Sequence, residues 1–127
     1  MSRRNDTVCT IRVCRDCCCG TERKHPDVDH DGLLARIEDG ARGAARVAVS
    51  ECLLACDQSN VVVVSPSPSG RRAGGRPVWI REVLDDSVAD AVVDWVSEGG
   101  PGWAPVPAAL AGLAFPPSGL SVEYVRV

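Results

Sequence analysis

The sequence predicts an α/β domain in which two helices pack on a four-stranded mixed sheet. Segments rich in β-branched residues alternate with two amphipathic segments, and 127 residues are enough for one domain with a real core. The predicted order is strand, helix, strand, strand, strand, helix. A strand–helix–strand crossover followed by a hairpin and a final helix gives a parallel pair of strands joined to an antiparallel pair.

The first half of the chain supplies the predicted parallel pair. Residues 6–14, "DTVCTIRVC", are rich in β-branched residues and predict a strand that ends at Cys14. An irregular segment containing glycine and proline follows. The stretch "HDGLLARIEDG" predicts a short helix that ends at Gly40, and "ARVAVS", residues 45–50, predicts the second strand. The apolar side of the helix consists of Leu33, Leu34 and Ile37.

The second half supplies a hairpin and a long helix. Four consecutive valines in "NVVVVSPS" predict a strand buried on both faces. Residues 65–76, rich in Ser, Pro, Gly and Arg, predict an irregular hairpin loop, and residues 77–83 predict the returning strand. The stretch "DDSVADAVVDWVSEGG" predicts a helix that begins at Asp85 or Asp86 as N-cap and stops at Gly99.

The expected domain covers residues 1–99, and residues 100–127 are expected to form a Pro/Gly-rich irregular extension. The extension holds five of the nine prolines and shows no sustained apolar period. The start "MSRRNDTVC" lacks the apolar run of a signal peptide, and no stretch approaches the roughly 18 to 20 apolar residues that span a bilayer. We therefore expect a cytoplasmic protein that does not contact the membrane.

Charge and motifs argue against nucleic-acid binding and against an enzyme. Fourteen Lys plus Arg and 17 Asp plus Glu give a net charge of −3, and no obviously basic face is expected. The pairs Arg3–Arg4 and Arg71–Arg72 are best interpreted as solvated charges, and "GRRAGGRP" lacks the strand-to-helix context of a phosphate loop. No Ser/His/Asp constellation stands out. We expect no active site.

Seven cysteines are the main functional signal. Their number is odd and their density is below that of a disulfide-rich secreted scaffold, so metal or redox chemistry is the expected use. Cys14 and Cys19 form C-x4-C, and after 32 residues Cys52 and Cys56 form C-x3-C. The predicted topology brings these two loops to the same end of the sheet. Four thiolates suit a [2Fe–2S] cluster, but by spacing they also suit structural zinc.

The remaining cysteines, histidines and tryptophans have other possible roles. Cys14 and Cys17 form a C-x-x-C after a strand, which is also the position of a thiol redox motif. Cys9 lies on the opposite face of its strand from Cys14 and is expected in the core. His25 and His30 are candidate cluster ligands, but they are more simply interpreted as solvated histidines. Trp79 and Trp95 are candidates for an electron path, but they are more simply interpreted as core residues.

The cysteine segments resemble a known family. The stretches "TIRVC", "CRDCCCG" and "SECLLACDQSNVVVV" are similar to those of the thioredoxin-like [2Fe–2S] ferredoxins, which are related to the small [2Fe–2S] subunit of NADH dehydrogenase; the resemblance covers roughly residues 6–98. It implies a thioredoxin-like fold, one [2Fe–2S] cluster and electron transfer to a redox partner protein.

The resemblance also implies which thiolates bind the cluster. It points to Cys14, Cys52 and Cys56 as ligands, together with one member of the run of three cysteines. Cys19 is chosen for its C-x4-C spacing, with Cys18 as its substitute. A second copy of the chain is a further candidate partner, because the 65–76 loop and the apolar tail could cover its surface.

Overall fold

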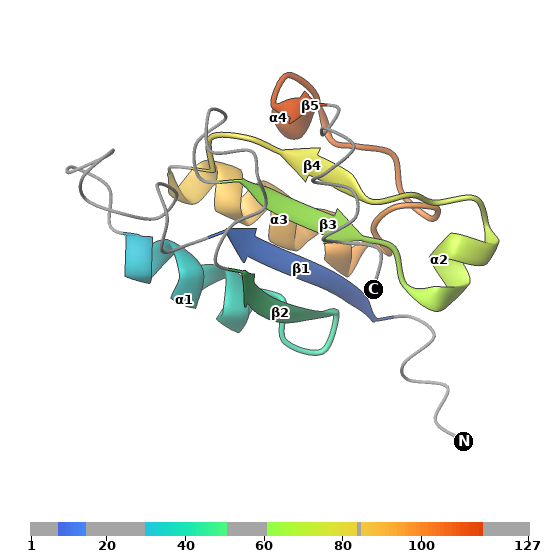
Figure 1. Cartoon of the computed structure of the whole chain (residues 1–127), viewed down its shortest axis with the longest axis horizontal. Coiled ribbons are helices and arrows are strands. Elements are labelled where there is room, and N and C mark those ends of the chain that lie inside the picture. The colour runs from blue at the N-terminus through green and yellow to red at the C-terminus, as the bar shows by residue number, and fades with distance from the viewer. Residues whose placement is uncertain (1–7, 15–29, 51–60, 84, 116–127) are drawn as a thin grey trace.

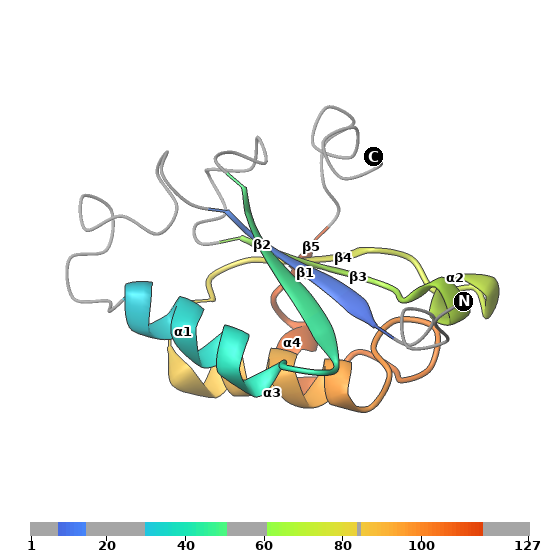
Figure 2. The same ribbon diagram turned by 90° about the horizontal axis from the view of Figure 1, so that it is seen from below.

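The computed structural model describes residues 8–14, 30–50, 61–83 and 85–115. The elements in chain order are β1 (Cys9–Cys14), α1 (His30–Gly40), β2 (Ala45–Ser50), β3 (Val62–Ser65), α2 (Pro68–Arg72), β4 (Val78–Ile80), α3 (Asp86–Ser97), α4 (Ala108–Ala111) and β5 (Ala114–Phe115). The strands form one sheet in the order β2-β1-β3-β4-β5. Helices α1 and α3 lie side by side on one face of it (Figures 1 and 2).

The sheet is mixed, as the sequence predicts. β1 pairs in parallel with β2 and antiparallel with β3, and β3 pairs antiparallel with β4. The predicted α/β class and the mixed four-stranded core β2-β1-β3-β4 are therefore confirmed. The predicted second strand, residues 45–50, matches β2 in both bounds, and the predicted first helix matches α1.

Local sequence signals account for α3. The carboxylate of Asp85 accepts a hydrogen bond from the backbone N–H of Val88 at 3.0 Å, which makes Asp85 the N-cap. At the other end, Gly99 has φ of 116°, and the N–H groups of Gly99 and Gly100 donate to the carbonyls of Val96 and Trp95. This is a Schellman motif, and it ends the helix where the sequence predicts.

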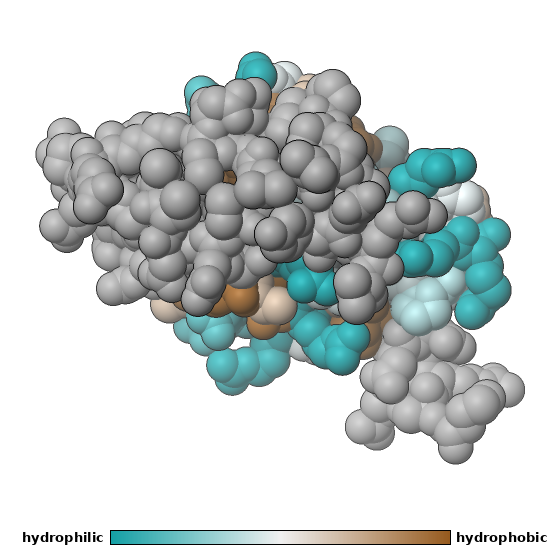
Figure 3. All heavy atoms as spheres, viewed as in Figure 1, coloured by the Kyte–Doolittle hydropathy of each residue, from teal (hydrophilic) through white to brown (hydrophobic). Residues whose placement is uncertain are grey.

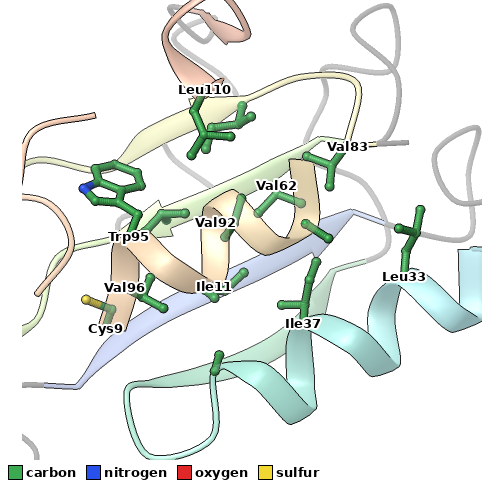
Figure 4. Close-up of a cluster of buried hydrophobic side chains, with 14 residues drawn as sticks. Cys9, Ile11, Leu33, Ile37, Val62, Val83, Val92, Trp95, Val96 and Leu110 are labelled. Carbon is green, nitrogen blue, oxygen red and sulfur yellow. The ribbon is translucent and has the colours of Figure 1, made fainter. Parts of the chain in front are cut away.

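The core lies between the sheet and the two helices. β1 contributes Cys9 and Ile11, both fully buried, and α1 contributes Leu33 and Ile37. From α3 the buried side chains are Ala89, Val92, Trp95 and Val96. Figure 4 shows these side chains converging from β1, α1 and α3. The predicted burial of Cys9, Trp79 and Trp95 is confirmed by their exposures of 0%, 3% and 1%, although Trp79 does not belong to this cluster.

The hairpin connecting β3 and β4 differs from the prediction. Residues 65–76 are not wholly irregular, because they contain α2. The Ser67 hydroxyl accepts a hydrogen bond from the N–H of Gly70 at 3.0 Å, and Pro68 occupies the first helical position. β4 is shorter than the predicted strand of residues 77–83, and just beyond its end Glu82 has φ of 54°.

The expected irregular tail is wrong for residues 108–115, which form α4 and β5. β5 pairs antiparallel with β4, so it adds a fifth strand to the sheet. Leu110 is fully buried in the same core as β1 and α3, and the indole N–H of Trp95 donates to the carbonyl of Ala104 at 3.0 Å. This segment forms regular structure because it buries apolar surface, although its sequence shows no apolar period. Residues 116–127 lie outside the described residues.

Candidate functional site at one edge of the sheet

Three strand termini lie together at the end of the sheet that contains the C-termini of β1 and β2. Cys14 is the last residue of β1, and its register partner in β2 is Ser50, the last residue of that strand. On the other side of β1, Val13 is paired with Val62, the first residue of β3. β1 and β2 therefore end, and β3 begins, at the same edge.

The order of the strands determines the distance that the connection between β2 and β3 must span. β2 and β3 lie on opposite sides of β1, so the chain that leaves Ser50 re-enters the sheet at Val62 with the end of β1 between these two points. Neighbouring strands are about 4.8 Å apart, so the two points are separated by roughly 10 Å across the sheet. The sequence between them carries Cys52 and Cys56.

The predicted ligands fall partly outside what the structure describes. The backbone of Cys14 is described, at the end of β1. Cys19, Cys52 and Cys56 lie outside the described residues, as do the two alternatives for the second ligand position, Cys17 and Cys18. Within residues 8–14, 30–50, 61–83 and 85–115, no group of three or more His, Cys, Asp or Glu side chains is placed to hold a metal ion.

Cys9 differs from the other cysteines in its surroundings. Its thiol donates to the carbonyl of Gly99 at 3.4 Å, and the side chain is completely buried. Burial raises the pKa of the Cys9 thiol, while a hydrogen bond from the backbone of Ser67 acts in the opposite direction. A protonated thiol in an apolar site is a poor nucleophile and a poor metal ligand. Cys9 therefore belongs to the core and not to the candidate site.

Sequence reasoning missed a groove on the face of the sheet that points away from α1 and α3. Its lining includes arginines from β1, β2 and α2, namely Arg12, Arg46, Arg71 and Arg72. The available signal was the two-residue spacing of Thr10 and Arg12, which places both opposite the buried Cys9 and Ile11. The convergence of α2 on these strands is a tertiary feature that no local pattern reveals.

Two further findings concern membrane-spanning helices and similarity to known proteins. In the described part of the chain, no helix has the length and apolar character needed to cross a membrane. Comparison with protein-family models, with curated proteins and with solved structures finds no match. The candidate site is defined by the spacing of the cysteines together with the positions of Cys14, Ser50 and Val62 at one edge of the sheet.

Proposed function

We propose that this chain is an electron-transfer protein that binds one [2Fe–2S] cluster through the thiolates of Cys14, Cys19, Cys52 and Cys56. The observation that carries the proposal is the pairing of Cys14 with Ser50 at the end of the parallel strands. The C-x3-C segment begins at Cys52, two residues after Ser50 in the sequence, and this short separation supports the proposal.

The length of the chain supports this arrangement. Cys52 follows Ser50 by two residues, and a chain spans at most about 3.6 Å per residue, so the two Cα atoms are no more than roughly 7 Å apart. Ser50 and Cys14 are neighbours across the ladder, about 4.8 Å apart. The Cα atoms of Cys14 and Cys52 are therefore at most about 12 Å apart, which allows both thiolates to bind one small cluster.

The topology also agrees with the fold that the sequence resemblance implies. A parallel pair β1–β2, an antiparallel pair β3–β4 and two helices on one face are the elements expected of a thioredoxin-like domain. In the proposed domain, β1 is hydrogen-bonded on both sides, so the backbone that carries Cys14 is held in a fixed position.

The donor set fits the cluster. Four thiolates, two on each iron, are the usual ligands of a [2Fe–2S] centre, and such a centre supplies one-electron transfer when bound. The role of the protein is to hold Cys14 on a central strand and to bring the other thiolates to it. With Cys9 buried elsewhere, six cysteines remain for the site and its surroundings.

The metal content tests the proposal directly. Protein purified without oxygen should be red-brown and contain about two irons and two acid-labile sulfides per chain. Cys9→Ala is the matched control, because it removes a thiol from the core and should leave the iron content per folded chain unchanged. Stoichiometric zinc in a colourless protein would contradict the proposal and support a zinc-stabilised module. A metal-free protein with a reversible Cys14–Cys17 disulfide would instead support a thiol redox role.

Variants in the run of three cysteines test the choice of the second ligand. In Cys19→Ser we expect partial retention of the cluster with an altered visible spectrum, because the adjacent Cys18 offers a replacement sulfur. Changing Cys18 and Cys19 together should remove most of the iron, whereas Cys17→Ser should leave the spectrum unchanged. Loss of the cluster in Cys17→Ser, with an unchanged spectrum in Cys19→Ser, would assign the position to Cys17.

A further inference from the structure

The groove on the face of the sheet opposite α1 and α3 lies near the start of β1. Thr10 of β1 is paired with Arg46 of β2 on one side and with Ser65 of β3 on the other, so these three residues share a face. Two adjoining hollows of about 600 and 390 Å³ lie here and have part of their lining in common. The shared residues are Thr10, Arg46, Pro66 and Arg71.

The groove is positively charged although the chain carries a net charge of −3. Arg12, Arg46 and Arg71 line it from three different elements, and the described part of its lining contains no Asp or Glu. Among the described residues, no carboxylate forms an ion pair with any of these three arginines. The ion pairs that do occur involve Arg36 and Arg42, outside the groove.

The side chain of Arg12 contains one N–H donor without a hydrogen-bond partner among the described residues. The Nε atom of Arg12 is buried and has no hydrogen-bond partner among the residues that the structure describes. Buried N–H groups are nearly always paired, because an unpaired one loses its hydrogen bond to water without replacement. Because this atom is closed to solvent, Arg12 contributes to anion binding through the positive charge of its guanidinium group and not through this N–H.

We propose that the groove binds a small molecule that carries phosphate groups, held by Arg12, Arg46 and Arg71. The larger hollow, lined by Arg46 and Arg71, has the volume of a small-molecule site, and Arg12 lines the smaller hollow that adjoins it. A guanidinium group presents its N–H donors in a flat fork that matches phosphate oxygens, and several fixed positive charges match a multiply charged anion better than a single carboxylate. Val8, Pro66 and Pro68 add an apolar wall for the remainder of the molecule.

The distribution of surface charge agrees with this assignment. Figure 3, coloured by hydropathy, shows hydrophilic side chains over the end of the molecule at which α2 lies, and the charged residues of α2 are Arg71 and Arg72. The solvent-facing side of α3, on the other face of the sheet, carries Asp86, Asp90 and Asp94 instead. An anion would therefore be attracted to the groove and not to the helical face. The proposal does not depend on the cluster.

Calorimetric titration of the full-length protein with inorganic pyrophosphate tests the proposal. At about 0.15 M NaCl, where exposed charges are largely screened, we expect one site with a dissociation constant below about 1 mM. Arg46→Ala and Arg71→Ala should each weaken binding about ten-fold, because each removes charge-assisted hydrogen bonds. Arg42→Ala is the matched control, since Arg42 is an exposed arginine outside the groove, and it should have no effect.

Both groove variants change exposed side chains, so circular dichroism should show an unchanged fold. Citrate, a polycarboxylate of similar charge, separates phosphate recognition from general attraction of anions and should bind more weakly than pyrophosphate. The proposal is overturned if pyrophosphate gives no saturable binding, if Arg42→Ala weakens binding as much as Arg46→Ala, or if citrate binds more tightly than pyrophosphate.

Discussion

Leu110→Ala tests whether the segment after α3 is part of the folded domain. Leu110 has no exposed surface and packs in the core shared by β1, α3 and β4. Truncation of a buried leucine to alanine costs about 2 to 5 kcal/mol, depending on how far the surroundings collapse into the space. α4 has only four residues and no side-chain N-cap, so it can adjust. We therefore expect the lower part of that range, about 2 to 3 kcal/mol of the free energy of unfolding.

For a chain of 127 residues, a loss of this size lowers the melting temperature by roughly 10 °C. Thermal unfolding followed by circular dichroism measures it, and urea unfolding gives the change in free energy independently. Leu113→Ala is the matched control, because Leu113 is in the same segment but only partly buried, and it should cost about half as much. A shift in Leu110→Ala no larger than in Leu113→Ala would refute the packing of this segment in the core.

Two further predictions concern the ends of α3. Asp85→Ala should cost about 1 kcal/mol at pH 7. Hydrogen bonds from a serine hydroxyl and a backbone N–H hold the pKa of the Asp85 carboxyl below its usual range, so its stabilising effect is present above about pH 4 and is lost as the pH falls through that lower pKa. A urea unfolding difference that is as large at pH 2 as at pH 7 would contradict this cap. Gly100→Ala should cost about 2 kcal/mol or more, because φ is 69° and a Cβ would lie 2.7 Å from the buried β1 thiol sulfur. Gly112→Ala, which meets nothing within 4 Å, should be nearly neutral, and equal losses in both glycine variants would contradict the clash.

The elements that the sequence predicts well are those with strong local signals. α3 has a capping aspartate, an apolar stripe and a glycine in positive φ, and all three can be recognised from the sequence of this one segment. The four valines of residues 61–64 are buried as predicted, since a run of apolar residues without alternation fits a central strand. The parallel pairing of β1 and β2 follows from the crossover that α1 makes.

The elements that the sequence does not predict have weak local signals or depend on contacts between distant segments. α2 begins with Ser67 and Pro68, a serine cap followed by proline at the first helical position, and this signal was obscured by the surrounding glycines and arginines. β5 has two residues and exists only because β4 offers a free edge. β4 also ends earlier than predicted, and Glu82, two residues beyond its end, has a positive φ of 54°.

Part of the candidate site is predictable from the sequence and part is not. That the cysteine segments leave one edge of the sheet follows from the order of the predicted elements, and the positions of Cys14, Ser50 and Val62 agree with it. Which cysteine of the run of three is a ligand depends on the path of a segment without periodic sequence, so spacing alone could not decide it. The arginine groove needs three elements to converge, and no single stretch of sequence contains that information.

The burial of Cys9 gives the protein an internal reporter of its own opening. Its thiol is enclosed between β1 and the carbonyl at the end of α3, so an alkylating reagent can reach it only when these two elements separate. When re-closing is fast compared with alkylation, the rate of modification measures the equilibrium population of the open form, and hence the free energy of that opening. Alkylation of Cys9, measured separately from that of the six other cysteines, can therefore follow native-state opening of the core without any engineered cysteine.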